Sequence, residues 1–305
     1  MKRIKIIMLL LCMAFLPLMA NAQEMLVGTY NIRYKNQGDS LRGEVWSKRC
    51  QVICDQVNFM APAIFGAQEV LHSQLTDMLS RLNGYDYIGV ARDDGAQKGE
   101  YAAIFYQRQR LQLLDNGNFW LSETPDRPGL GWDAACIRIC SWGKFRDLLT
   151  QKTFFVFNLH MDHVGMVARR EGARLVVNRI KEIAAGATAI LTGDFNVDQT
   201  DEIYSIFVDS GCLKDSYQCA PIRFAENGTF NSFNTRLKSD SRIDHVFVSP
   251  QTEVMAYGVL TDSYWTPKSR KNRRGKDAPR ELSFKKGVIH HPSDHYPVFV
   301  RILLP

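Results

Sequence analysis

The sequence predicts an α+β fold in which two mainly antiparallel sheets stack face to face and helices cover their outer faces. Many short apolar segments alternate with polar residues, as half-buried strands do, and only a few amphipathic helices separate them. Strands that outnumber helices bury their apolar faces most simply against a second sheet. No internal repeat or long linker divides the 305 residues, so we expect one domain over residues 23–305.

Residues 1–22 have the composition of an export signal. Three cations within the first five residues precede an apolar run at residues 6–19, which ends in Ala-Asn-Ala at residues 20–22. The run is shorter than the ~20 apolar residues of a spanning helix. The sequence thus predicts a cleaved signal peptide, a mature chain that starts at Gln23, and a periplasmic or extracellular monomer without stable membrane insertion.

The composition excludes several classes of protein. With 45% hydrophobic and 23% charged residues, the chain is not disordered, collagen-like or coiled-coil. Its formal net charge of +6 includes the three N-terminal cations, so the mature chain is close to neutral. This near neutrality argues against a protein that coats nucleic acid non-specifically.

Four amphipathic stretches predict the helices, in chain order, at residues 44–60, 71–82, 167–184 and 201–209. In the first, apolar side chains recur at helical spacing; the second stops at Asn83-Gly84, a favourable helix end. The third has an outer face of arginine and glutamate, and Thr200 is expected to cap the fourth.

Strand-forming residues with alternating apolar faces predict the strands. They lie at residues 25–33, 63–70, 85–91, 101–106, 111–121, 134–145, 153–160, 188–196, 243–249, 253–260 and 296–304. The five consecutive strands between residues 85 and 160 predict an antiparallel meander.

Two further features each allow two interpretations. Residues 268–280 hold seven cations and one carboxylate, which fits either a solvated loop or a flap that faces phosphate. Trp265 precedes this segment and is a candidate for stacking on substrate. Of the six cysteines after residue 22, only Cys212 and Cys219 lie in a loop-like stretch, where either a disulfide or two thiols fit.

Ionisable and amide side chains interrupt the apolar strands at their ends. The segments are TYNIR with Asn31, AQEV with Glu69, NLHMDH with His160, TGDFN with Asp194 and Asn196, RIDHVFVS with Asp244, and PSDHYPV with Asp294 and His295. A carboxylate at the end of a buried strand is costly unless a metal or hydrogen-bond donors compensate it. Six such segments predict one shared cleft at an edge of the sheets.

These motifs, in this order, resemble the endonuclease/exonuclease/phosphatase (DNase I-like) superfamily of Mg²⁺-dependent phosphohydrolases. The resemblance covers Met25 to Leu304. It implies a four-layer α/β/β/α sandwich, a Mg²⁺ or Mn²⁺ cofactor and a phosphate-ester substrate, with nucleic acid as one candidate.

The resemblance also implies the roles around the metal. Glu69 matches the metal-binding carboxylate, with Asn31 beside it and Asp294 as a further candidate ligand. Oxygen ligands of this kind suit Mg²⁺ or Mn²⁺. His295 matches the family histidine, and Asp244 the aspartate that orients it, a pair suited to proton transfer or phosphate contact.

The remaining roles concern the water and the substrate. Asp194 and Asn196 match the pair that positions the attacking water; whether Asp194 or the His295–Asp244 pair is the base stays open. His160 matches a second histidine of the deoxyribonuclease branch, which Glu100 would orient. Arg33 and Asn31 are expected to contact the substrate, Arg33 through phosphate.

The sequence therefore predicts an exported, Mg²⁺-dependent phosphodiesterase of the nuclease type. A phosphomonoesterase or a lipid head-group phosphodiesterase is the alternative within this class. A non-catalytic polyanion-binding protein of the same fold is the alternative outside it.

Overall fold

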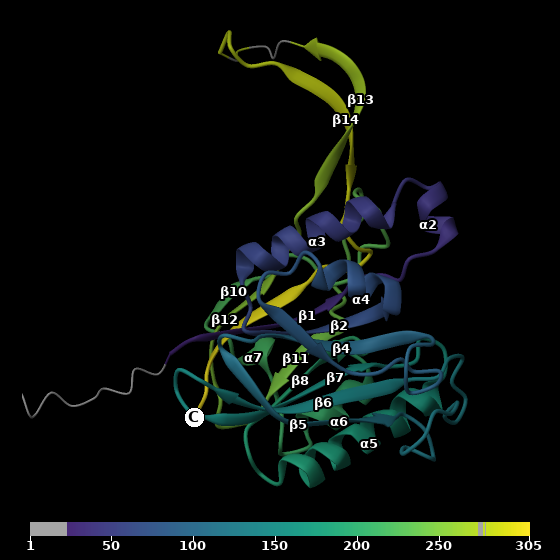
Figure 1. Cartoon of the computed structure of the whole chain (residues 1–305), viewed down its shortest axis with the longest axis vertical. Helices are drawn as coiled ribbons and strands as arrows, with labels where there is room; N and C mark the ends of the chain where they lie inside the picture. Colours follow the sequence, from purple (N-terminus) through teal and green to yellow (C-terminus); the bar gives the residue numbers. More distant parts are fainter. Residues whose placement is uncertain (1–22, 274–276, 278) are drawn as a thin grey trace, which may run out of the picture.

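The structure, a computed structural model, describes residues 23–273, 277 and 279–305, so the predicted signal peptide lies outside the described residues. Two sheets form its centre (Figure 1). In spatial order, the larger sheet consists of β10 (Ile222–Phe224), β12 (Glu253–Val259), β15 (Val298–Leu303), β1 (Met25–Asn31), β2 (Ile64–Leu71), β4 (Glu100–Gln107) and β3 (Tyr85–Ile88). The smaller sheet consists of β5 (Leu111–Trp120), β6 (Ile139–Asp147), β7 (Thr153–His160), β8 (Ala189–Asp194), β11 (Asp244–Val248) and β9 (Lys214–Asp215).

Helices cover the outer face of each sheet. On the larger sheet these are α3 (Trp46–Met60) and α4 (His72–Leu79), with the short α2 (Gln37–Leu41) nearby; α5 (Met166–Ala184) and α6 (Glu202–Val208) cover the smaller sheet (Figure 1). The four-residue α7 (Ser216–Cys219) packs against β11 and β12. In the part of the chain described, no helix has the length and apolarity to span a bilayer.

Three apolar clusters hold these layers together. One lies between the sheets and includes Val27, Ile190 and Val300. A second lies between α5, α6 and the smaller sheet, and a third between α3, α4 and the larger sheet. The predicted four-layer sandwich is thus confirmed, and it exists because each sheet is apolar on both faces.

The predicted meander between residues 85 and 160 is confirmed in two parts, since β3 pairs with β4 and β5, β6 and β7 pair in order, all antiparallel, but the chain changes sheet between β4 and β5. β3 and β4 join the larger sheet, whereas β5, β6 and β7 join the smaller one. Alternation of apolar residues indicates which faces are buried, and it does not indicate which neighbour a strand pairs with. Both sheets are also mixed, because β1 pairs with β2, β7 with β8, and β10 with β12 in parallel.

For the basic segment the sequence left a solvated loop and a phosphate-facing flap open, and the structure describes part of it within two paired strands. β13 (Tyr264–Arg273) and β14 (Phe284–His290) pair in an antiparallel ribbon that belongs to neither sheet. In Figure 1 the ribbon extends from the α3 side of the molecule, away from both sheets. The six cysteines among the described residues are free thiols, including Cys212 and Cys219.

Two local errors in the predicted elements have a clear physical cause. Asp201 rather than Thr200 caps α6, because its side chain accepts from the Ile203 amide while the Thr200 hydroxyl donates to Asp198. The strand predicted at residues 134–145 begins only at Ile139. Asp162 holds the preceding residues as a loop.

Asp162 is the buried acceptor that organises this loop. Its carboxylate accepts from the amides of Ala135 and Cys136 at 3.1 Å each, and from those of Val164 and Gly165 at 2.9 and 2.8 Å. The Arg138 guanidinium donates to it at 3.3 Å. Burial alone would raise the pKa of Asp162, but these donors hold that pKa far below its ordinary value.

Replacing Asp162 with Asn should therefore lower the free energy of unfolding by about 3–5 kcal/mol, since it leaves Arg138 buried without its counter-charge. Because folding lowers the pKa of Asp162, this contribution is complete above about pH 4 and shrinks as the pH falls. Urea unfolding of both proteins at several pH values measures the difference.

The matched control is Asp126→Asn, which removes an exposed ion pair to Arg179 at 3.2 Å. It should change the free energy of unfolding by less than about 1 kcal/mol. Equal effects of the two substitutions would contradict the structural role of Asp162.

Candidate active site

A cleft of about 530 Å³ opens where strands of the two sheets end, and it contains most of the predicted site residues. Within the smaller sheet, His160 on β7 and Asp244 on β11 are the direct neighbours of Asp194 on β8. The larger sheet supplies Asn31 at the end of β1 and Glu69 near the end of β2. Residues from both sheets thus face the same space.

The backbone departs from regular strand geometry at the cleft. Arg33, Glu69 and Asn196 have φ values of 58°, 60° and 49°, a left-handed conformation that side chains other than glycine rarely adopt. At Glu69 this conformation coincides with a register shift between β2 and β4, which turns the carboxylate out of the ladder. Strained backbone of this kind is common at functional sites.

Asn31 connects the carboxylates of the two sheets. Its side-chain amide donates to Glu69 Oε1 at 3.0 Å and to Asp194 Oδ2 at 2.9 Å, and its nitrogen lies 3.4 Å from His295 Nε2. Its oxygen accepts from the Arg33 amide at 2.9 Å. Asn31 therefore positions two carboxylates; its predicted roles as a metal ligand and a substrate contact stay predictions.

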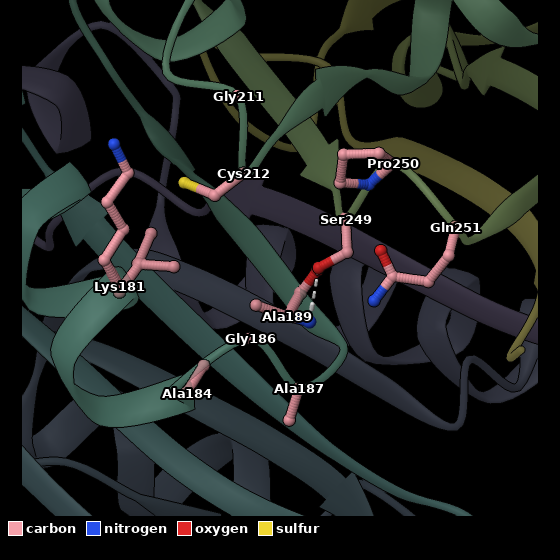
Figure 2. Close-up of a pocket in the computed structure, with 11 residues that line it drawn as sticks. Lys181, Ala184, Gly186, Ala187, Ala189, Gly211, Cys212, Ser249, Pro250 and Gln251 are labelled. Atoms are coloured by element: carbon pink, nitrogen blue, oxygen red, sulfur yellow. Dashed lines mark hydrogen bonds between the residues drawn. The ribbon is translucent and has the colours of Figure 1, made fainter.

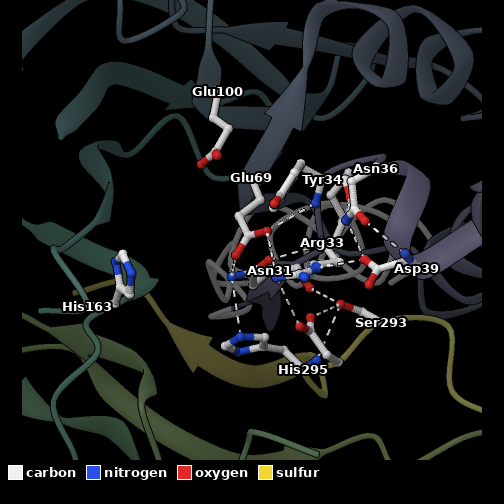
Figure 3. Close-up of polar contacts among 12 residues, drawn as sticks. Asn31, Arg33, Tyr34, Asn36, Asp39, Glu69, Glu100, His163, Ser293 and His295 are labelled. Atoms are coloured by element: carbon white, nitrogen blue, oxygen red, sulfur yellow. Dashed lines mark hydrogen bonds and ion pairs between the residues drawn. The ribbon is translucent and has the colours of Figure 1, made fainter. Parts of the chain in front are cut away.

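Arg33 lies among three carboxylates (Figure 3). Its guanidinium donates to Asp39 at 2.9 Å and lies 3.5 Å from Asp294 and 3.9 Å from Glu69. Glu69 also accepts from the Tyr34 amide at 3.1 Å. The position between Glu69 and Asp294 thus already stabilises a cation.

His295 and Asp244 form the predicted pair. The Nδ1 atom of His295 lies 2.9 Å from Asp244 Oδ2, and its Nε2 atom lies 3.7 Å from Asp194 Oδ2. Burial alone would lower the pKa of His295, but the Asp244 and Asp194 carboxylates outweigh it and hold that pKa well above its ordinary value. Burial also raises the pKa of Asp194, to about 7.

His160 and Glu100 face each other at the other end of the cleft. His160 Nδ1 lies 3.8 Å from Glu100 Oε2, and His160 Nε2 lies 3.5 Å from Asp194 Oδ2. Burial and the nearby Arg138 and Arg92 guanidinium groups hold the pKa of His160 well below its ordinary value. His160 is therefore neutral near pH 7, whereas His295 is protonated.

The donor set at the centre of the cleft fits a divalent cation. Glu69, Asp194 and His295 each offer a ligand atom, and these atoms lie within 4.8 Å of one another. Because His295 already binds Asp244 through Nδ1, the carboxylates are the more available ligands. Buried carboxylate oxygens beside a position that already stabilises Arg33 suit a hard cation such as Mg²⁺ or Mn²⁺.

The structure brings nearly all the predicted site residues together. The cleft is lined by Arg33, Glu69, Glu100, His160, Asp194, Asn196, Asp294 and His295. Asn31 and Asp244 lie directly behind them and are buried. Trp265 lies on the ribbon and is not among the lining residues, so its stacking role stays a prediction.

Sequence reasoning missed several residues that line the cleft. Arg138 binds Asp162, and Arg92 donates to Glu100 at 2.7 Å. Phe230 packs edge-on against His295, with ring centroids 5.0 Å apart. Arg138 directly precedes the buried strand β6. A polar residue at the end of a buried strand was the pattern that identified the other site residues, so Arg138 could have been predicted. Arg92 and Phe230 lie in connecting segments and do not show this pattern.

A second hollow lies between the end of α5 and the turn after β11 (Figure 2). It measures about 290 Å³, and its polar side chains are those of Lys181, Cys212, Ser249 and Gln251. No histidine or carboxylate lines it. The cleft, rather than this hollow, is the candidate active site.

Comparisons with known proteins agree with this geometry. A model described as Endonuclease/Exonuclease/phosphatase family matches residues 28–295. A Bacteroides thetaiotaomicron structure of that family is 48% identical, with a TM-score of 0.84 over 92% of this chain and 98% of that chain. A mannosyl-6-phosphatase from the same species is also 48% identical, with a TM-score of 0.83 over 92% of this chain and 100% of that chain.

The matches to curated proteins are partial. Nocturnin from Xenopus laevis is 26% identical over 220 residues, which are 67% of this chain. The chain spans 60% of the length of a mimivirus relative and 54% of that of nocturnin.

Replacing Asp244 with Asn should lower the pKa of His295, since the neighbouring negative charge that stabilises the imidazolium is lost. An NMR titration of the ring carbons in metal-free protein measures this pKa. The Asp126→Asn variant serves as the control and should leave the titration of His295 unchanged. An unaltered pKa in the Asp244→Asn variant would show that the two side chains do not form this pair.

Proposed function

The chain belongs to the endonuclease/exonuclease/phosphatase family of phosphate-ester hydrolases, and we propose that it is an exported phosphoesterase that requires Mg²⁺ or Mn²⁺. One observation carries the proposal: Asn31, Glu69, Asp194 and His295, from distant parts of the chain, lie within hydrogen-bonding or ion-pairing distance in one cleft. The pattern of residues 1–22 supports export, although these residues lie outside those described.

The arrangement suits hydrolysis of a phosphate ester by water. A divalent cation at Glu69 would supply positive charge to the non-bridging oxygens of the phosphate. His295, protonated because of Asp244, donates a hydrogen bond to phosphate. Asp194, whose pKa burial raises to about 7, accepts the proton of the attacking water.

The other residues position these groups. The Asn196 amide donates to Asp194 Oδ1 at 3.0 Å, and the Asn196 side chain donates to the carbonyl of Met161 at 3.0 Å. The aspartate is therefore held at a fixed orientation toward the water. Neutral His160 faces the cleft next to Asp194, and its ring N–H is placed to donate a hydrogen bond to the leaving oxygen.

For the substrate, a phosphomonoester of a sugar has the stronger support. The mannosyl-6-phosphatase is 48% identical over 92% of this chain. The activity in its name is that of the relative, and it is the support for a sugar phosphate as substrate here. The nuclease-type phosphodiesterase that the sequence favours is the second candidate. It is supported by His160 and Arg33, the features shared with deoxyribonucleases, which both line the cleft. A catalytically inactive polyanion-binding protein has less support, because the proposed catalytic groups lie together.

Replacing Glu69 with Gln should reduce Mg²⁺-dependent hydrolysis by about 10²–10⁴-fold, since one cation ligand and its charge are lost. The control Glu182→Gln alters an exposed glutamate on α5, whose side chain is 67% exposed, and should keep full activity. Both variants should unfold like the parent protein.

The assay uses hexose 6-phosphates, bis(p-nitrophenyl) phosphate and supercoiled DNA with the mature chain. Phosphate release from the sugars that exceeds diester cleavage would support the phosphomonoesterase, and the reverse order would favour the second candidate. Full activity of the Glu69→Gln variant on all three substrates would refute the proposed site.

A further inference from the structure

Among the described residues, the ribbon of β13 and β14 contacts the body at its base, where His290 lies 3.0 Å from Glu44. Within the ribbon, His290 also lies 2.8 Å from the Thr266 hydroxyl, and its ring stacks on Tyr264. Beyond this base the two strands pair with each other and with no third strand among the described residues. A two-stranded ribbon without a core behind it is only marginally stable in water, which indicates a surface made for a partner.

Large apolar side chains are exposed along the described part of the ribbon and its connecting turn. Their exposed fractions are 60% for Trp265, 50% for Leu282, 51% for Phe284, 41% for Val288 and 39% for Ile289. Trp265 pairs with Ile289 across the strands, so the two side chains share one face of the ribbon. Exposed apolar residues concentrated in one element commonly mark an interaction site.

Basic residues accompany these apolar side chains. In the sequence, residues 264–290 hold nine Lys or Arg and only two Asp or Glu, a net charge of +7. The remaining residues after position 22 carry a net charge of −4. Lys268, Lys285 and Lys286 belong to this set and are exposed. By sequence, residues 264–290 are therefore cationic, whereas the rest of the mature chain has a weakly negative net charge.

We propose that the ribbon is a docking surface for a bilayer that contains anionic lipid, with Phe284 and Val288 entering the head-group region. Side chains alternate along β14, so Phe284, Lys286 and Val288 lie on one face of the ribbon. Lysines bind the lipid phosphates, and apolar side chains partition into the interface, so such a surface uses both kinds of residue. Single-stranded nucleic acid would use the cations and the aromatic rings, but it offers little to Val288, Ile289 and Leu282. This inference goes beyond the proposed function.

The position of the ribbon connects docking to the cleft. β14 ends at His290, only four residues before Asp294, which lines the cleft. A bilayer bound by the ribbon would therefore bring the protein to substrates at a membrane surface. Binding itself requires no catalysis, so it is tested separately from hydrolysis.

The test is sedimentation of the full mature chain with vesicles of phosphatidylcholine, with or without phosphatidylglycerol. The chain should bind the anionic vesicles and lose binding as salt concentration rises. The double substitution Phe284→Ser with Val288→Ser removes two exposed apolar side chains from one face of the ribbon and should weaken binding at least about tenfold through lost apolar burial. Lys285→Glu with Lys286→Glu lowers the net charge of residues 264–290 from +7 to +3 and should weaken the preference for anionic lipid.

The control is Leu149→Ser, which removes an exposed leucine on the turn between β6 and β7 and should leave binding unchanged. All variants should keep the parent protein's unfolding curve and its hydrolysis of soluble substrate, because the ribbon lies outside both sheets. If the parent protein and the variant with two apolar substitutions bind anionic vesicles equally, the proposal is overturned.

Two other results would also overturn it. One is binding to oligo(dT), lost in the ribbon variants, without binding to vesicles, since this makes nucleic acid the partner. The other is dimerisation in analytical ultracentrifugation that the ribbon variants abolish, again without vesicle binding, since this makes a second copy the partner.

Discussion

Four carboxylates are buried in the cleft or directly behind it, and the groups that compensate their charges determine the arrangement of the site. The carboxylates are those of Glu69, Asp194, Asp244 and Asp294. Burying them without partners would cost more than a domain of this size can supply. Asn31 donates to two of them, Arg33 lies beside Glu69 and Asp294, and His295 pairs with Asp244. The buried carboxylates of the cleft therefore stabilise positively charged groups.

The stacking of the two sheets is what brings these groups together. Asn31 and Glu69 come from the larger sheet, whereas Asp194 and Asp244 occupy one row of the smaller sheet. Loss of the interface between the sheets would separate the carboxylates from their donors. The left-handed backbone at Arg33, Glu69 and Asn196 adds strain that the surrounding hydrogen bonds sustain. Fold and site thus depend on the same packing.

The sequence predicts the site better than the path of the chain. Polar residues that interrupt apolar strand segments can be recognised in the sequence, so Glu69, Asp194 and His295 could be predicted as site residues. Strand pairing is less visible, because a buried strand can pair with any of several apolar strands, so the change of sheet between β4 and β5 was not predicted. Asp162 shows a second limit: this buried acceptor holds the amides of Ala135 and Cys136 in a loop, so β6 begins later than the periodicity predicts. The ribbon includes described residues of a charged segment that the sequence assigned to either a loop or a flap.

The central claim, a divalent cation bound at Glu69 in the cleft between the two sheets, is tested most directly by anomalous diffraction from crystals grown with Mn²⁺. The account predicts a single strong peak within bonding distance of a Glu69 carboxylate oxygen, close to Asp194 and His295. A Mn²⁺ peak elsewhere in the molecule, with none in the cleft at a concentration that supports hydrolysis, would contradict it.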